Sequence, residues 1–182
     1  MDIILKSVTF PEPESFVDYK INKRENDIFS YTKAPSDKLG SLEAFCQGFK
    51  EKEYDDYEDN EEGEEKKDKD KCHKVLSNIT NVIVEIDYPV SKPAIFKFDC
   101  TSTEVTYGLV LYLYTYAYQL MYKLEDEDVG ESTNNIPGML NRERSEGRFG
   151  IWGHDIGDLV YNGISTLSFS GDTVICYFSC DS

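Results

Sequence analysis

The segment from residue 102 to residue 125 constrains the fold of this chain more than any other. It carries one apolar stripe and a second stripe rich in tyrosine, so a helix formed by it has to be buried over most of its girth. Thr101 and Glu104 have the spacing of a capping box, which predicts a helix from about Ser102 to Glu125. A strand over Leu109 to Tyr118 is the alternative, because aliphatic residues and tyrosines alternate there.

Alternating apolar and polar positions elsewhere predict a sheet against which this helix packs. Two hairpins are indicated, one formed by residues 79–88 and 94–99 and the other by residues 166–169 and 173–180. The N-terminal third shows shorter elements: strands at residues 2–10, 16–22 and 27–32, a turn at residues 23–26, and a helix within residues 39–49 that Ser41 caps. These elements predict an α+β fold, an antiparallel sheet with one long buried helix and one or two short helices.

The length of 182 residues suits one domain, residues 1–182, with a hydrophobic core of its own. A charged tract at about residues 50–74 interrupts it, with 12 acidic and 7 basic residues and almost no aliphatic ones. Such a segment cannot bury enough apolar surface to offset the entropy lost on ordering. We therefore expect this insertion to be a mobile surface loop.

The charge of the chain is strongly acidic, with 35 acidic against 19 basic residues. Outside the charged tract the balance is still 23 against 12, so the folded body is acidic as well. Such a surface repels phosphate groups, which argues against nucleic acid and anionic membranes as partners. A basic protein partner or a metal ion is easier to accommodate. The most apolar window, Val105 to Met121, is too short and too rich in tyrosine for a membrane span.

The cysteine pattern predicts reduced thiols in a cytoplasmic protein, because the count of five is odd and no secretory leader is evident. The spacing of the cysteines and the two histidines matches no zinc motif. The glycines match neither a Walker loop nor a dinucleotide fingerprint. No metal and no cofactor is therefore predicted.

Residues 141–163 form the most site-like stretch, because they gather the only tryptophan, one of the two histidines, three arginines and five glycines. Apolar residues from Ile156 to Ile164 have the spacing of one helical face, which predicts a helix that begins by His154. The candidate site residues are His154, Asp155 and Asp158 for catalysis and Arg142, Arg144, Arg148 and Trp152 for ligand binding.

Each of these residues has a functional and a structural interpretation. His154 can act as a general acid or base that Asp158, four residues later, orients. The interpretation we favour is that His154 or Gly153 caps a helix whose dipole Asp155 and Asp158 complement.

The arginines before this helix could receive a phosphate or carboxylate, although ion pairs with surface acids are favoured. Trp152 could be a stacking platform for a ligand. We instead expect it to be a core anchor that pins the loop.

The pattern Asn141-Arg142 followed by GRFGIWGHDIGDL (residues 147–159) resembles a signature of an uncharacterised family from large DNA viruses of amoebae (Marseillevirus-like) and some eukaryotic proteins. The tyrosine-rich helix that ends in acids is similar to another recurring block of that family. The resemblance covers roughly residues 95–165. It implies no activity, and it places the protein in the host-cell cytoplasm or the virion.

These observations lead to a function hypothesis and two alternatives. The first is a soluble binding or structural module that engages a protein partner, because no complete catalytic set is present. The second is a hydrolase- or transferase-like enzyme with a His154–Asp158 pair and an arginine-based anion site. The third is self-association through residues 173–180, if that apolar strand lies at the edge of the sheet.

Overall fold

The structure is a computed structural model that describes residues 3–10, 20–26, 34–47, 72–129 and 144–182, with the backbone alone at residues 26 and 162–165. The charged tract lies outside these ranges except for residues 72–74, and Arg142 lies outside them as well. The expected mobility of the tract therefore stays a prediction.

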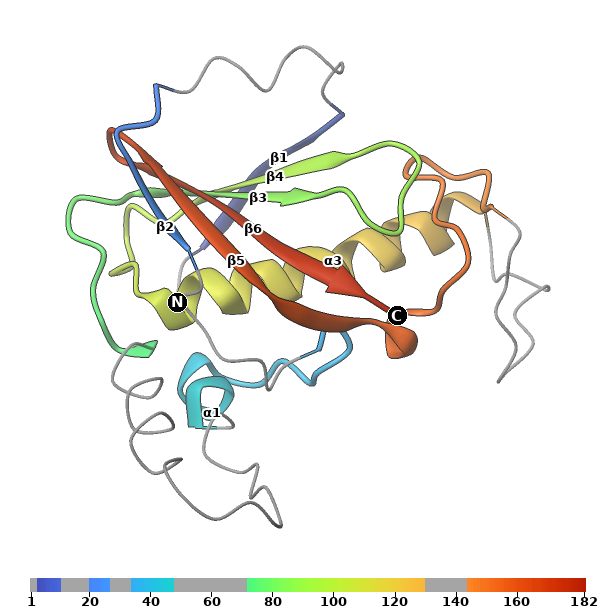
Figure 1. The fold of residues 1–182 in the computed structure, drawn as a ribbon, viewed down its shortest axis with the longest axis horizontal. Coiled ribbons are helices and arrows are strands. Elements are labelled where there is room, and N and C mark those ends of the chain that lie inside the picture. Colours follow the sequence, from blue (N-terminus) through green and yellow to red (C-terminus); the bar gives the residue numbers. More distant parts are fainter. Residues whose placement is uncertain (1–2, 11–19, 27–33, 48–71, 130–143) are drawn as a thin grey trace.

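A six-stranded sheet of order β1-β4-β3-β6-β5-β2 forms the body of the molecule (Figure 1). The strands are β1 (Ile4–Thr9), β2 (Lys23–Asn26), β3 (Asn81–Ile86), β4 (Ala94–Asp99), β5 (Val160–Ser170) and β6 (Thr173–Asp181). All neighbouring strands are antiparallel except β3 and β6, which pair in parallel. Together with its helices this gives the α+β fold that the sequence predicts.

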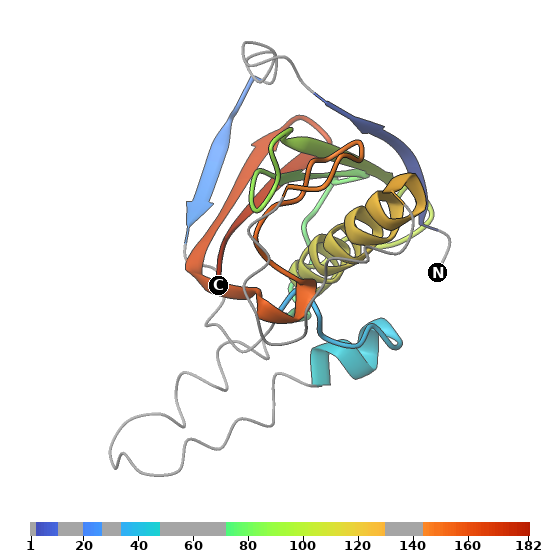
Figure 2. The same ribbon diagram turned by 90° about the vertical axis from the view of Figure 1, so that its right-hand side faces the viewer.

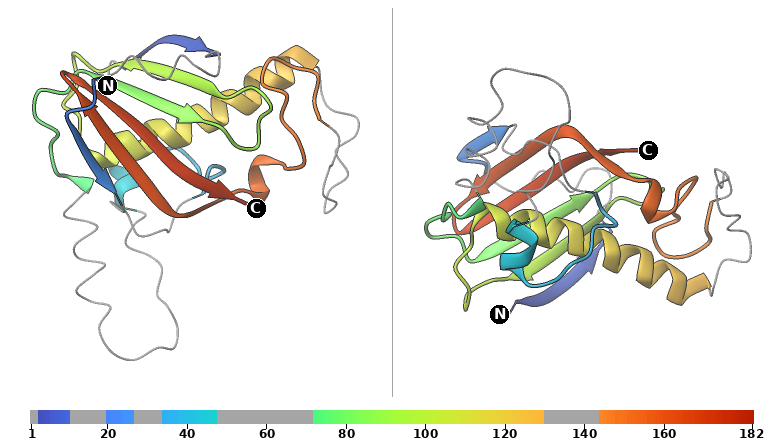
Figure 3. Two further views of the ribbon diagram at one scale, coloured as in Figure 1. Left: turned by 45° about the horizontal axis from the view of Figure 1, so that its top comes forward. Right: turned by 90° about the horizontal axis from the view of Figure 1, so that it is seen from below.

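The long helix α3 (Tyr107–Val129) lies in the hollow of the curved sheet, as Figure 2 shows. The short helix α1 (Leu42–Gln47) packs on the far side of α3 from the sheet (Figure 3). Its Ser41 cap is confirmed, because the Ala44 N–H donates to Ser41 Oγ at 3.1 Å. Residues 109–118 lie within α3, so the helix prediction is confirmed and the strand alternative is wrong. Both faces of α3 bury side chains, including Leu113 and Tyr114, as the two stripes predict.

The start of α3 differs from the prediction. Thr101 is not part of a capping box, because its hydroxyl and its N–H both donate to Asp99 Oδ1, at 2.5 and 2.9 Å. The helix begins five residues later than expected, at Tyr107, where Thr106 Oγ1 accepts the N–H of Leu109 at 3.1 Å. Thr101 and Thr106 both offer a hydroxyl ahead of an apolar run, so either could cap the helix. Thr101 is bonded to Asp99 instead, which leaves Thr106 as the cap.

The tyrosines of α3 fasten the helix to the sheet. The Tyr114 hydroxyl lies 3.1 Å from the carbonyl oxygen of Glu85 and 2.9 Å from that of Phe178, which belong to β3 and β6. The Tyr118 hydroxyl donates to the carbonyl oxygen of Tyr88 at 2.8 Å. The polar tips of these buried rings thus fix the backbone where β3 ends, and this end of the sheet carries the candidate site.

Both predicted hairpins are confirmed, as β3–β4 and β5–β6. The prediction that residues 173–180 form an edge strand is wrong, because β6 lies between β3 and β5. Its parallel pairing with β3 joins residues about ninety positions apart, and hydrophobic periodicity carries no signal of such a contact. Among the described residues the outer strands are β1 and β2.

Two local predictions are also wrong. Residues 23–26 form the edge strand β2 rather than a turn, and their charged side chains are usual for an edge. The helix expected over residues 156–164 is reduced to the 3₁₀-helix η3 (Ile156–Asp158), and β5 begins at Val160. Pairing with β6 overrides the helical spacing of the apolar residues. The predicted strands at residues 16–22 and 27–32 lie almost wholly outside the described ranges.

The described chain adds two general facts. None of the five cysteines forms a disulfide bond within the described residues. Each helix in the described ranges is too short or too polar to span a lipid bilayer.

Candidate functional site

A buried carboxylate near the end of α3 holds the loop that carries the candidate residues. Glu125 is only 3% exposed. Its carboxylate accepts the backbone N–H groups of Phe149, Gly150 and Ile151 at 2.8, 3.0 and 3.4 Å, and the Ser145 hydroxyl. Bonds from several donors to one buried charge are strong and directional, so they fix the loop backbone relative to the helix.

Two glycines permit this arrangement. A Cβ atom at Gly147 would lie 2.4–2.6 Å from the carboxyl atoms of Glu125, closer than any side chain allows. Gly150 has a φ of +61°, a left-handed conformation in which a side chain would be strained. The glycines of this segment thus serve the close approach of a carboxylate to backbone.

The anchored loop turns Trp152 outward. Its backbone is fixed, because the Trp152 N–H donates to the Pro89 carbonyl at 3.0 Å. Trp152 is 41% exposed, so the expectation of a core anchor is wrong. The buried ring of the loop is Phe149, which stacks on Phe96 with centroids 6.1 Å apart.

Three rings meet at the surface where β3 ends, and we call Tyr88, Trp152 and His154 the aromatic corner. The planes of Tyr88 and Trp152 are 84° apart, with centroids separated by 5.5 Å. The His154 centroid lies 5.8 Å from that of Tyr88 and 6.1 Å from that of Trp152. Figure 3 shows the end of β6 beside the segment that contains η3.

The side chain of His154 contacts the end of β6 rather than Asp158. Its Nε2 atom is 3.1 Å from Ser182 Oγ, which is also 3.0 Å from the Tyr88 hydroxyl. The Nδ1 atom is buried and has no hydrogen-bond partner among the described residues. A neutral imidazole carries one proton, and the lack of an acceptor at Nδ1 favours that proton on Nε2, as a donor to Ser182.

The two aspartates after His154 serve the local backbone. Asp158 Oδ2 accepts the N–H of Asp155 at 3.0 Å, and the Asp158 N–H donates to the Asp155 carbonyl at 3.0 Å. These bonds close the single turn of η3. Asp158 therefore braces this single turn. The N-cap residue of η3 is Asp155, so the expectation that His154 or Gly153 caps a helix here is wrong.

The arginines do not converge on one point in the described chain. Arg148 forms a two-pronged ion pair with Asp128, at 2.7 Å from Nε to Oδ2 and 2.6 Å from Nη2 to Oδ1. The hydrogen bonds from Arg148 lower the pKa of Asp128 to about 2. The backbone of Arg144 forms an isolated antiparallel β-bridge with that of Trp152, and the Arg144 guanidinium lies against Gly150. Arg148 thus behaves as a surface ion-pair partner.

Four exposed aspartates lie close in the sequence to the residues of the aromatic corner. Asp87 directly precedes Tyr88, Asp181 directly precedes Ser182, Asp155 directly follows His154, and Asp158 comes four residues after His154. None of the four takes part in an ion pair within the described ranges. Desolvation raises the pKa of Asp87 above its ordinary value. The corner therefore combines exposed aromatic surface with unneutralised negative charge.

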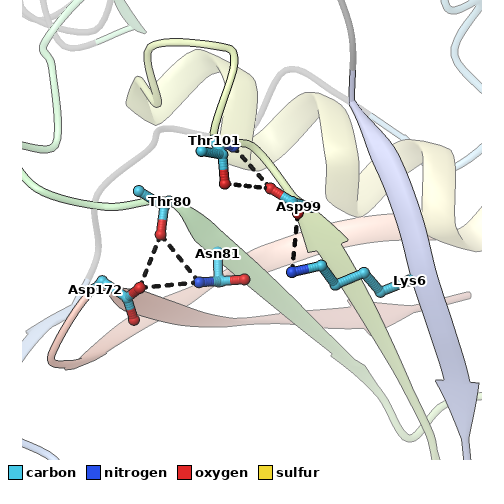
Figure 4. Close-up of polar contacts among 6 residues, drawn as sticks. All are labelled: Lys6, Thr80, Asn81, Asp99, Thr101 and Asp172. Carbon is cyan, nitrogen blue, oxygen red and sulfur yellow. Dashed lines mark hydrogen bonds and ion pairs between the residues drawn. The ribbon is translucent and has the colours of Figure 1, made fainter.

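The opposite end of β3 carries a second polar cluster, drawn in Figure 4. Asp172 Oδ2 accepts from Thr80 Oγ1 at 2.9 Å and from Asn81 Nδ2 at 3.2 Å. Asp99 accepts from Thr101 and lies 2.9 Å from Lys6 Nζ. These carboxylates tie strand ends and turns together, so we assign the cluster a structural role.

Sequence reasoning placed His154, Asp155, Asp158, Trp152 and Arg144 in one region, and the structure brings them near one another. It missed Glu125, Tyr88 and Ser182. Glu125 stood in an acidic run at the end of a helix, where charge is normally solvated, and only the three-dimensional fold brings it under the loop. No group of three potential metal ligands occurs in the described part of the chain.

Comparison of the chain with known protein families, with curated proteins and with solved structures finds no match. The resemblance to the viral family therefore stays a prediction.

Proposed function

We propose that this protein is a binding module that engages a protein partner through the aromatic corner. The observation that carries the proposal is the exposed indole of Trp152 on a backbone fixed by Glu125. Tryptophan is among the residues that most often dominate binding energy at interfaces. A preorganised loop also loses little conformational entropy when it binds, which favours affinity.

The enzyme alternative has less support from the same residues. A base that activates Ser182 needs a free lone pair on Nε2 of His154, whereas the unpartnered Nδ1 favours the proton on Nε2. Asp158, expected to orient the imidazole, accepts the Asp155 N–H instead. Arg148 is neutralised by Asp128, which leaves one fewer cation for an anionic substrate.

A capture experiment with two matched variants tests the proposal. Wild type, Trp152→Ala and Tyr116→Ala are immobilised and exposed to extract from the cells that produce the protein. Tyr116 is 40% exposed on α3 and serves as the control for loss of an exposed aromatic ring. We expect a partner that wild type and Tyr116→Ala retain and that Trp152→Ala loses. A partner retained equally by all three, or no partner at all, contradicts the proposal.

A further inference from the structure

The geometry points to a cationic side chain, lysine or arginine, as the group that the aromatic corner receives from a basic segment of the partner. This inference rests on the proposed function and names the chemistry of its partner. It depends on the arrangement of the rings, on the charge around them and on the rigidity of the loop.

The rings provide surfaces suited to a cation. Tyr88 and Trp152 stand nearly perpendicular, at 84°, so they border a corner as two adjacent walls. The face of an aromatic ring is electron-rich and attracts ammonium and guanidinium groups within about 6 Å of its centroid, most strongly for tryptophan. With 41% of Trp152 exposed, a side chain from another molecule can reach this surface.

The charge around the rings has the matching sign. Asp87, Asp155, Asp158 and Asp181 are exposed and take part in no ion pair within the described residues. The basic residues whose backbones contact the loop are Arg144 and Lys92, so the local balance stays negative. A cation placed at the corner is therefore attracted by the carboxylates as well as by the rings.

The loop is already held in the geometry that such a ligand needs. Glu125 fixes the backbone at Phe149 and Gly150, and Pro89 fixes Trp152. Few contacts have to form or break when the cation arrives, so an exposed site of this kind can bind without a conformational change.

The single tryptophan of the chain supplies a direct readout. Short peptides of equal length, in which glycine alternates with lysine, glutamine or glutamate, are titrated at low salt while Trp152 emission is followed. We expect a saturable change with the lysine peptide and none with the glutamine peptide. A response to the glutamate peptide instead overturns the inference and points to an anion site at Arg144.

Variants separate the corner from the general acidity of the protein. Trp152→Leu, measured by calorimetry, is expected to bind the lysine peptide about five- to tenfold more weakly, because the aromatic face is lost while the charge is unchanged. Asp155→Asn is expected to weaken binding, and Glu104→Gln, an exposed control, is expected to bind like wild type. Equal affinity of wild type and Trp152→Leu overturns the inference.

The two proposals fail in distinguishable ways. If Trp152→Ala loses its captured partner but no lysine peptide binds wild type, the corner is a docking site and the cationic chemistry is wrong. If lysine peptides bind through Trp152 and no partner is captured, the cationic site stands and the proposed protein-binding function is wrong.

Discussion

The two ends of β3 carry carboxylates in opposite circumstances. Where the strand begins, Asp172 accepts hydrogen bonds from Thr80 and Asn81, and these bonds, with Thr173, lower its pKa. Where the strand ends, Asp87 directly precedes Tyr88 of the aromatic corner, and desolvation raises the pKa of Asp87. The first carboxylate is stabilised by its surroundings as a charged group, and the second is not.

This difference separates a structural cluster from a candidate site. The ends lie about 20 Å apart along a strand of this length, well beyond the Debye length of about 8 Å at physiological salt. Their charges therefore act independently. At the first end the polar groups satisfy one another, whereas at the second the carboxylates form no ion pair within the described residues and Trp152 is exposed.

The largest expected effect on stability comes from Glu125, whose carboxylate holds the loop of the aromatic corner in place. Glu125→Ala leaves three buried backbone N–H groups without their acceptor, so we expect a loss of about 3 kcal/mol in the free energy of unfolding. Urea unfolding measures it. The control Glu127→Ala, which removes an exposed acid 3.9 Å from Lys123, is expected to change stability by less than about 0.5 kcal/mol. Similar losses in both variants would show that Glu125 does not anchor the loop.

A smaller effect is expected from Gly147→Ala. The new methyl group would lie 2.4–2.6 Å from the Glu125 carboxyl atoms, and relief of that overlap is expected to cost about 2 kcal/mol. Gly157→Ala is the matched control, because a Cβ there meets nothing within 4 Å. Thermal unfolding compares the two. If they are equally stable, the close packing of loop on carboxylate is wrong.

The pH dependence of the free energy of unfolding sharpens the comparison further, because Asp172 and Asp87 are expected to affect it with opposite signs. Because the folded-state pKa of Asp172 is lowered, this group stabilises the protein above about pH 4 and loses that effect as pH falls through its folded pKa. Asp172→Asn is therefore expected to be less stable than wild type near neutral pH, and the difference narrows in acid. Denaturant unfolding over a pH series measures it.

Asp87 has the reverse sign. Its raised folded-state pKa means that it destabilises the protein as pH rises above the unfolded-state pKa of about 4, and the effect is complete above the folded-state pKa. Asp87→Asn is expected to be more stable than wild type at neutral pH and equal to it below about pH 4. A residue whose replacement increases stability but weakens binding is typical of a functional site. Shifts of the same sign in the two variants would remove the contrast between the ends.

The sequence predicts the elements whose patterns are local. The stripes of residues 102–125, the two hairpins and the Ser41 cap need only neighbouring residues, and the structure confirms each of them. The parallel pairing of β3 with β6 and the start of β5 at Val160 depend on distant partners, so hydrophobic periodicity does not predict them.

The candidate site is predictable to the same extent. Rare residue types among glycines single out residues 141–163 as an unusual segment. The outward position of Trp152 is not predictable, because it follows from the burial of Phe149 and from Glu125, which precedes Phe149 by 24 residues in the chain. Tyr88 and Ser182 join the site only because β3 and β6 end at the same place.

The most direct test compares the same charge change at the two ends of β3. Asp87→Asn and Asp172→Asn both remove one negative charge and both retain Trp152, so emission titrations with the lysine peptide are directly comparable. We predict that Asp87→Asn binds the peptide more weakly than wild type and that Asp172→Asn binds it with unchanged affinity. Equal weakening in both variants would show that the peptide responds to the overall negative charge, and the aromatic corner would not be the site.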